Sequence, residues 1–242
     1  MKPLLILGTG LAGYTLAREF RKLDKTRPMV LVTADDGSAY AKPNLSNALA
    51  AGRSAEALVQ SDARSMAAQL QARVLTRCRV ITINTQARQI HVVPMDDRQT
   101  DVNRAAQSSI EIIDYAQLVL ALGAEPLRLP IAGNAADRIL SVNDLDDYRR
   151  FREALAACVS PARVAILGGG LIGCEFANDL ALAGHAVQVI DIASQALGRL
   201  LPASLSGSTR TPSQALQQAL AQAGVQWRDR KSTRLNSSHT DI

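Results

Sequence analysis

Two glycine-rich turns of the same spacing carry the residues with the clearest chemistry in this 242-residue sequence. In the first, Gly8, Gly10 and Gly13 form a GxGxxG pattern that directly follows an apolar run over residues 4–7. After a strand, the first glycine permits a tight turn, the second lets backbone approach a pyrophosphate, and the third lets the next helix pack closely. The N-terminus of that helix then points backbone N–H groups at the phosphates. The pattern predicts a dinucleotide site.

An acidic residue completes this first pattern. Apolar positions between Leu16 and Leu23 indicate one face of a helix, and the run from Met29 to Val32 predicts a second strand. Asp35 follows that strand, where the carboxylate of a dinucleotide-binding unit takes the hydroxyls of the ribose. The alternative is a glycine turn that serves only the packing of the helix on the strand.

The same arrangement occurs a second time. Gly168, Gly170 and Gly173 follow a strand predicted at residues 163–167, and Asp191 ends the strand after the next helix. The distance along the chain from the first glycine to this acid is close to the roughly 20 residues expected where the ribose of NAD is held. One such unit binds one dinucleotide. Two units therefore predict two dinucleotides, most simply a bound flavin and an exchangeable nicotinamide cofactor.

The elements between the two turns agree with an α/β fold. Runs rich in β-branched residues predict strands, and amphipathic patterns predict further helices. The polar stretch 94–109 predicts a long loop. We therefore expect two Rossmann-like βαβ dinucleotide-binding units in a three-layer architecture. Further helices are predicted at residues 61–72, 144–157 and 212–223, and further strands at residues 73–83, 88–93, 110–113 and 118–122.

Composition and charge exclude several classes of function. Only 3% of the residues are aromatic, unlike an RNA-binding sheet that stacks bases. The net charge of +5 is a mild excess typical of a solvated surface, and nothing indicates a nucleic-acid partner. No apolar run approaches the roughly 18 residues of a transmembrane helix, and residues 1–3 lead straight into a strand. We expect no membrane segment and a cytoplasmic location.

The residues that most often bind metals do not cluster in the sequence. Cys78, Cys158 and Cys174 fit neither a CxxC pair nor a zinc-binding pattern, which predicts reduced, structural thiols. His91 and His185 stand far apart, so no metal site is expected.

Residues 229–242 differ from the rest of the chain. The stretch DRKSTRLNSSH has no apolar periodicity and resembles a reading-frame translation of a sequencing adapter. We expect residues 229–242 to be a non-native tail.

Several longer stretches resemble a known family, the FAD-dependent pyridine-nucleotide reductases. Within that family the likeness is strongest to the reductases of rubredoxin, with those of flavorubredoxin as near relatives. The likeness runs from Leu4 to about Trp227. It is carried by ILGTGLAGYTLAREFRKLD, TADDGSAYAKPNLS, LVLALGAEP, NDLDDYRRFR and LGGGLIGCEFANDL.

The resemblance implies a flavoprotein of three domains that binds FAD and NAD(H). Residues 1–122 would be the N-terminal part of an FAD-binding domain and residues 123–228 an incomplete NAD-binding domain, truncated before a C-terminal interface domain. The NADH site would consist of Gly168, Gly170, Gly173 and Asp191. The FAD site would hold the pyrophosphate at Gly8, Thr9, Gly10, Leu11, Ala12 and Gly13, the ribose at Asp35, the adenine near Val80, and the flavin near Lys42 and Glu175.

Two departures from the wider family bear on the electron acceptor and a third feature on the donor. Leu122 replaces the threonine of the family's ATG motif, and Asn47 stands where ferredoxin-type relatives carry a lysine. Both differences favour rubredoxin over ferredoxin. The acid at position 191 favours NADH, because its carboxylate would repel the additional phosphate of NADPH.

The implied chemistry needs no catalytic side chain, because the two cofactors carry the reactive atoms of a hydride transfer. Residues 38–48 contain no cysteine pair of the kind that disulfide reductases use. Electrons would therefore leave singly to a small acidic iron protein, rubredoxin, or to a related carrier such as ferredoxin or flavorubredoxin. Arg149, Arg150 and Arg152 could steer such a partner or could form a solvated helix face. The alternative of another class is a non-catalytic dinucleotide-binding fragment.

Overall fold

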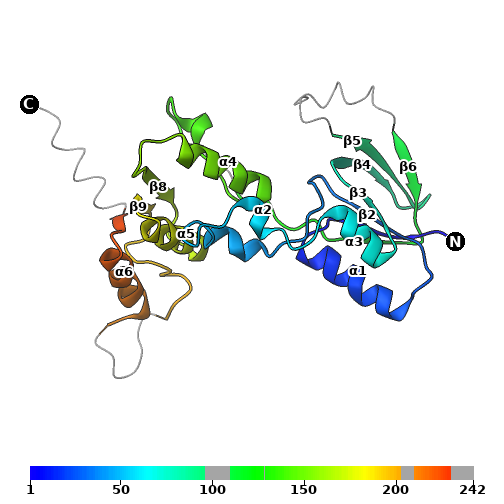
Figure 1. Ribbon diagram of the computed structural model, residues 1–242, viewed down its shortest axis with the longest axis horizontal. Helices are drawn as coiled ribbons and strands as arrows, with labels where there is room; N and C mark the ends of the chain where they lie inside the picture. Colours follow the sequence, from blue (N-terminus) through cyan, green and yellow to red (C-terminus); the bar gives the residue numbers. More distant parts are fainter. Residues whose placement is uncertain (96–109, 128, 203–209, 230–242) are drawn as a thin grey trace, which may run out of the picture. The chain divides into compact units, whose positions relative to one another are not determined.

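The computed structural model describes residues 1–95, 110–127, 129–202 and 210–229 (Figure 1). The chain forms two compact units. One comprises Met1–Lys42 and Glu56–Ala136, and the other comprises Pro43–Ala55 and Asp137–Ile242. Each unit contains its own parallel sheet and one of the two glycine-rich turns.

The first unit is built on a parallel sheet that is buried on both faces. Its strand order is β3-β2-β1-β7. All eight residues of β1 and β2 are buried, which explains why both strands read as unbroken apolar runs in the sequence. The strands are β1 (Leu4–Leu7), β2 (Met29–Val32), β3 (Arg73–Leu75) and β7 (Gln117–Leu120).

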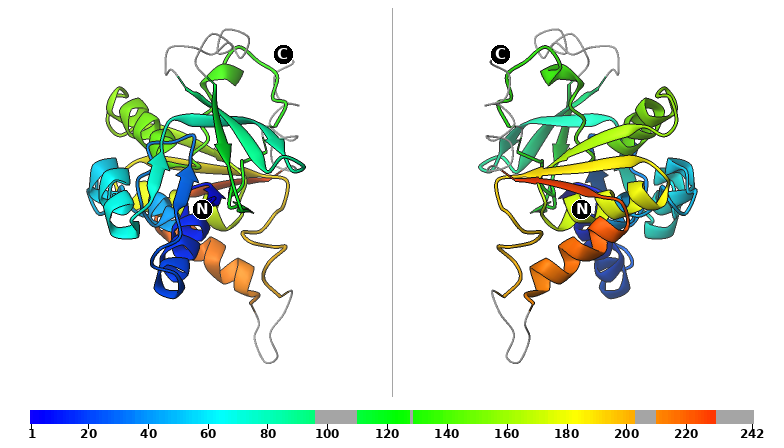
Figure 2. Two further views of the ribbon diagram at one scale, coloured as in Figure 1. Left: turned by 90° about the vertical axis from the view of Figure 1, so that its right-hand side faces the viewer. Right: turned by 90° about the vertical axis from the view of Figure 1, so that its left-hand side faces the viewer.

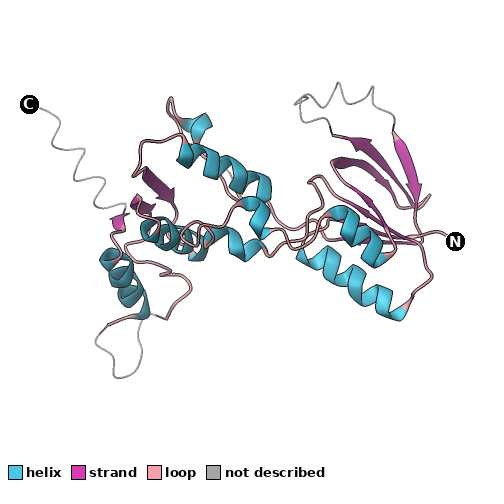
Figure 3. Cartoon of the chain, in the orientation of Figure 1, coloured by secondary structure: helices cyan, strands magenta, loops and turns pink. Residues whose placement is uncertain are grey.

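Different elements cover the two faces of this sheet, so the unit has three layers (Figure 3). Leu4 and Ile6 pack with residues of the helices α1 (Leu11–Leu23) and α3 (Ala63–Leu70). Leu5 and Leu7 point the other way, because side chains alternate along a strand, and they pack with an antiparallel sheet of order β4-β5-β6. Its strands are β4 (Cys78–Asn84), β5 (Gln89–Pro94) and β6 (Glu111–Asp114).

The prediction of one strand over residues 73–83 is wrong in one respect. The chain breaks at Arg77, which has a φ of +50°, and the pieces on either side become β3 and β4 in two different sheets. Asp62 is the N-cap of α3, because its carboxylate accepts a hydrogen bond from the Ser65 N–H at 2.7 Å. Residues 96–109, where the long loop is predicted, lie outside the described residues.

The described residues of the second unit form a parallel sheet of order β10-β9-β8 and the α-helices α4, α5 and α6. Asp144 caps α4 by accepting the Asp147 N–H, and Thr211 forms a capping box with Gln214 at α6. Asp229, where the predicted tail begins, is the last residue of β10, and residues 230–242 lie outside the described part. The elements are α4 (Leu145–Ala156), β8 (Arg163–Leu167), α5 (Leu171–Leu182), β9 (Ala186–Asp191), α6 (Pro212–Gln222) and β10 (Gln226–Asp229).

Residues 43–55 join the second unit although they come early in the chain. They follow the start of the short 3-10 helix η1 (Lys42–Ser46) and end at α2 (Ala55–Leu58). The buried Asp179 carboxylate of α5 accepts the backbone N–H groups of Leu49 and Ala50 at 2.8 and 3.0 Å. This segment is separate in sequence from the rest of its unit, and the division predicted at residue 122 does not anticipate it.

Helix α4 holds the same segment at its far end. The Arg152 guanidinium and the Tyr148 hydroxyl both donate to the carbonyl of Arg53, at 2.7 and 3.4 Å.

No helix among the described residues is long and apolar enough to cross a membrane.

The burial of the first sheet can be tested by replacing Leu31 with alanine. Leu31 is fully buried in β2, so L31A removes packed methyl groups and leaves a cavity. We expect the free energy of unfolding in urea to fall by about 2–5 kcal/mol. Leu23 ends α1 and is 89% exposed, so the control L23A should change it by less than about 0.5 kcal/mol. Equal losses in the two variants would contradict the packing described.

The attachment of residues 43–55 can be tested with D179N and trypsin. An asparagine presents only one acceptor oxygen and loses the charge, so the two backbone hydrogen bonds weaken by about 1.5–3 kcal/mol. We expect cleavage after Arg53 to become roughly ten- to a hundredfold faster. Asn178 is the exposed neighbour on α5, and N178A should leave the cleavage rate unchanged. If D179N is cleaved at the same rate as the unmodified chain, Asp179 does not hold the segment.

Candidate nucleotide-binding sites

The first glycine turn lies where β1 ends and α1 begins, and two of its positions admit only glycine. Gly8 has a φ of +107°, and a Cβ there would lie 2.1 Å from the carbonyl oxygen of Ala121. A Cβ at Gly13 would lie 2.0 Å from the carbonyl oxygen of Gly8. Helix α1 therefore approaches the end of β1 as closely as the spacing predicted.

The middle glycine of this turn, Gly10, has a different role. Gly10 is the N-cap of α1, where it offers no side-chain cap, and a Cβ there would meet nothing within 4 Å. Leu11 and Ala12 follow it as exposed residues of the first helical turn. The first N–H groups of a helix lack partners inside the helix. The open space beside Gly10 therefore leaves room for the pyrophosphate of a dinucleotide at these N–H groups.

Asp35 lies beside this turn and is fixed by three donors. Its Oδ1 accepts the Thr33 hydroxyl at 2.7 Å, the Gly37 N–H at 2.9 Å and the Thr9 hydroxyl at 3.3 Å. Among the described residues, no hydrogen bond to Oδ2 is found. An ionised carboxylate offers about four acceptor positions, so Asp35 retains capacity for the hydroxyls of a ribose. Thr9 is almost completely buried, which orients its hydroxyl toward the acid.

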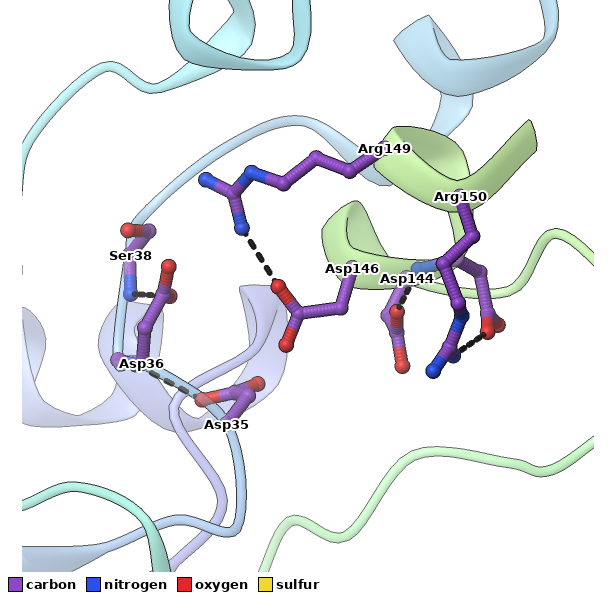
Figure 4. Close-up of polar contacts among 9 residues, drawn as sticks. Asp35, Asp36, Ser38, Asp144, Asp146, Arg149 and Arg150 are labelled. Carbon is purple, nitrogen blue, oxygen red and sulfur yellow. Dashed lines mark hydrogen bonds and ion pairs between the residues drawn. The ribbon is translucent and has the colours of Figure 1, made fainter. Parts of the chain in front are cut away.

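Tyr14 connects helix α1 to the loop that carries Asp35. Its hydroxyl donates to the carbonyl of Gly37 at 2.6 Å. Burial, and to a lesser degree the charge of Asp35, raises the pKa of Tyr14 to about 12, so it stays a donor at neutral pH. The next acid, Asp36, turns away to accept the Ser38 N–H at 2.9 Å (Figure 4).

The second glycine turn, between β8 and α5, repeats the geometry of the first. Gly168 has a φ of +104°, and a Cβ at Gly173 would lie 2.0 Å from the carbonyl oxygen of Gly168. Gly170 is the N-cap of α5, has no side-chain cap, and has nothing within 4 Å of where a Cβ would be. This turn therefore fits a second pyrophosphate by the same criteria.

Asp191 takes the place in the second unit that Asp35 has in the first. Its Oδ2 accepts the N–H of Gly169, and its Oδ1 accepts the N–H of Ala193 at 2.7 Å. Asp191 is only partly buried. It can therefore take ribose hydroxyls in addition to these two bonds.

The remaining predicted residues lie in different parts of the chain. Glu175 of α5 accepts the Ser46 hydroxyl at 2.5 Å, and both residues belong to the second unit. Lys42 is an exposed residue of the first unit, at the start of η1. Val80 pairs with Val92 between β4 and β5. Their contacts with a flavin stay predictions.

The three arginines of α4 have local contacts. Arg149 pairs with Asp146 at 2.5 Å and Arg150 pairs with Asp147 (Figure 4), while Arg152 binds the carbonyl of Arg53. The first two are exposed or half-buried pairs between neighbouring turns of a helix, which contribute little to stability.

The cysteines do not form a redox centre in the described structure. All three are free thiols, and burial raises the pKa of Cys174 and of Cys78. Among the residues that the structure describes, no group of three or more His, Cys, Asp or Glu side chains could hold a metal ion.

Sequence reasoning missed three residues that shape these sites: Tyr14, Asp179 and Trp227. Tyr14 sits within the predicted apolar face of α1, where its hydroxyl carries no signal of its own. Asp179 stands four residues after Glu175, so the two lie on one face of α5, and that spacing could have identified it. Trp227, whose ring lies against Gly169 of the second turn, has the sequence pattern of an ordinary strand residue.

Comparison with known proteins identifies the family. Residues 2–240 match the family described as pyridine nucleotide-disulphide oxidoreductase. The chain is 45% identical to a rubredoxin-NAD(+) reductase of Acinetobacter baylyi over 93% of its own length and 52% of that protein's. It is 33% identical to a nitric oxide reductase FlRd-NAD(+) reductase of Aeromonas hydrophila over 93% of its length and 50% of the relative's. The chain thus spans about half the length of the curated relatives it matches.

Solved structures show the same fold. The covalent putidaredoxin reductase–putidaredoxin complex matches with a TM-score of 0.73 and 27% identity, over 94% of this chain and 49% of that one. The water-forming NADH oxidase of Lactobacillus brevis, bound to NADH, matches with a TM-score of 0.76 and 17% identity, over 94% and 46%. From its two glycine turns, its parallel sheets and these likenesses, the chain belongs to the pyridine nucleotide-disulphide oxidoreductase family.

Proposed function

We propose that this chain provides the two nucleotide-binding units of an FAD-dependent oxidoreductase that passes electrons from NADH to rubredoxin. The observation that carries the proposal is the repeated turn: two helices begin at an uncapped glycine, and a fixed carboxylate lies beside each turn. The names of the relatives support the choice of donor and acceptor.

The residues of the first unit would hold FAD. The N–H groups that follow Gly10, at Leu11 and Ala12, would bind the pyrophosphate, and Asp35 would bind the ribose. Val80 would adjoin the adenine, and Lys42 would lie on the flavin side of the site. When bound, the flavin would accept a hydride from the nicotinamide and release electrons one at a time.

The residues of the second unit would hold NADH. The N–H groups that follow Gly170 would bind the pyrophosphate. Asp191 would accept the ribose hydroxyls and repel the additional phosphate of NADPH, which makes NADH the preferred donor. The Ser46 hydroxyl fixes the Glu175 carboxylate, and the family resemblance assigns Glu175 to the flavin.

The acceptor would be a one-electron carrier because the described structure offers no pair of cysteines to store two electrons. Rubredoxin is named in two relatives that are 45% and 40% identical to this chain. Flavorubredoxin and ferredoxin are the alternatives within this class, and a non-catalytic dinucleotide-binding fragment is the alternative outside it. A cytoplasmic location stays a prediction from the sequence.

The two turns can be tested separately with G10A and G170A. Neither new methyl group meets protein atoms, so both variants should fold normally, but each methyl would occupy space proposed for a pyrophosphate. We expect G10A to weaken FAD binding at least about tenfold with NADH binding unchanged, and G170A to do the reverse, as measured by calorimetry. Each variant is the control for the other. Loss of both ligands in one variant, or of neither in both, would contradict the assignment.

The reaction can be tested on the 242-residue chain purified with FAD. We expect NADH to bleach the flavin absorbance and rubredoxin to restore it, with a smaller rate for NADPH. The variant C78A/C158A/C174A should keep the rate within about twofold, since no thiol takes part. A colourless chain that binds NADH but transfers no electrons would favour the non-catalytic alternative.

A further inference from the structure

Trp227 is the single tryptophan of the chain, and it lies against the second glycine turn. It belongs to β10, which runs parallel to β9 (Figure 2). A Cβ built at Gly169 would lie 2.0 Å from Cη2 of the indole ring. Position 169 therefore has no room for a side chain, because the ring already fills that space.

The polar edge of the same ring reaches the loop after β9. The indole N–H of Trp227 donates to the carbonyl of Ala193 at 3.3 Å. Gly169 and Ala193 are also the two residues whose N–H groups bind the Asp191 carboxylate. One side chain thus contacts both residues that hold the proposed ribose acid.

The first unit has the same arrangement from a different element. Asp35 accepts the N–H of the residue two positions later, Gly37, as Asp191 accepts that of Ala193. The carbonyl of Gly37 accepts the hydroxyl of Tyr14, as that of Ala193 accepts the indole N–H of Trp227. Each acid is thus followed by a short turn, and an aromatic side chain holds that turn by a hydrogen bond to one of its carbonyl groups.

The position before the second glycine is matched as well. In the first turn this residue is Thr9, whose hydroxyl binds Asp35. In the second it is Gly169, whose backbone N–H binds Asp191. In both units the acid is therefore hydrogen-bonded to a residue of the glycine turn. In the second unit this residue is Gly169, and the Trp227 ring packs against it.

We propose that Trp227 is a positioning residue of the NADH site, which sets the Asp191 carboxylate relative to the glycine turn and thereby sets the preference for NADH over NADPH. The inference rests on the proposed function. The ring supports the turn at Gly169, and the indole N–H holds the loop at Ala193. Loss of the N–H would let the acid move, which weakens its grip on the ribose and its repulsion of a phosphate at the same position.

The experiment compares W227F with Y14F. Y14F removes only the hydroxyl, whereas W227F removes the indole N–H and also the part of the ring that contacts Gly169. We expect W227F to weaken NADH binding roughly two- to tenfold in calorimetry, because both contacts that hold the turn and the loop are lost, and to leave FAD binding unchanged. Y14F should weaken FAD binding by a similar factor and leave NADH binding unchanged. Q226A changes the exposed neighbour of Trp227 in β10 and should affect neither ligand.

The ratio of the NADPH and NADH dissociation constants separates positioning from mere stability. A general loss of folding lowers both affinities equally, whereas a displaced Asp191 weakens NADH more than NADPH. We expect the ratio to fall about twofold or more in W227F and to stay constant in Q226A and Y14F. Melting temperatures, measured alongside, show that binding is compared between folded proteins.

The single tryptophan offers a second measurement in the unmodified chain. ADP-ribose lacks the nicotinamide and so cannot absorb the tryptophan emission. We expect it to shift that emission nevertheless, because it would bind at the turn and the loop that the indole contacts. Y14F should show the same shift, since it keeps Trp227.

The outcomes are distinct. An unchanged NADH affinity and an unchanged selectivity ratio in W227F, with normal NADH binding by the unmodified chain, would overturn the positioning role and leave the proposed function intact. An unmodified chain that binds neither NADH nor ADP-ribose would overturn the proposed function and the inference with it. Equal losses for NADH and NADPH would also overturn the inference.

Discussion

The close approach of a helix to the end of a strand is the constraint on which both candidate sites depend. At Gly13 and at Gly173 a side chain would place Cβ 2.0 Å from the carbonyl oxygen of the first glycine of the turn. Only glycine permits this approach, which brings the N-terminus of the helix over the carboxyl end of the strand. The uncapped N–H groups, the open space above them and the neighbouring acid are all consequences of that packing.

The acids are held by different chemistry in the two units although their positions correspond. Asp35 receives two hydroxyls and one N–H, and Asp191 receives two N–H groups. The anchoring aromatic residue also differs, because Tyr14 comes from the helix that follows the turn and Trp227 comes from the third strand of its sheet. In both units the result is the same: a half-buried carboxylate that accepts a backbone N–H and can still accept the hydroxyls of a ligand.

The strands at residues 4–7 and 29–32 have the predicted bounds, because both are buried on both faces and a continuous apolar run has few other interpretations. The strand at residues 163–167 also has its predicted bounds, although its residues are exposed or half-buried. The break at Arg77 was not predictable, since it depends on a left-handed backbone at a residue type that rarely adopts one. Tyr14 and Trp227 escaped notice because a polar hydrogen on an aromatic ring gains a role only from the tertiary structure.

Helix α5 explains why residues 43–55 belong to the second unit. The helix begins at Gly170, the N-cap of the proposed NADH turn, and continues as a rigid element through Glu175 and Asp179. These two acids, one helical turn apart on one face, hold Ser46 and the backbone at residues 49–50. The same helix that would receive the pyrophosphate of NADH at its N-terminus thus also holds residues 46–50, which come from a distant part of the chain.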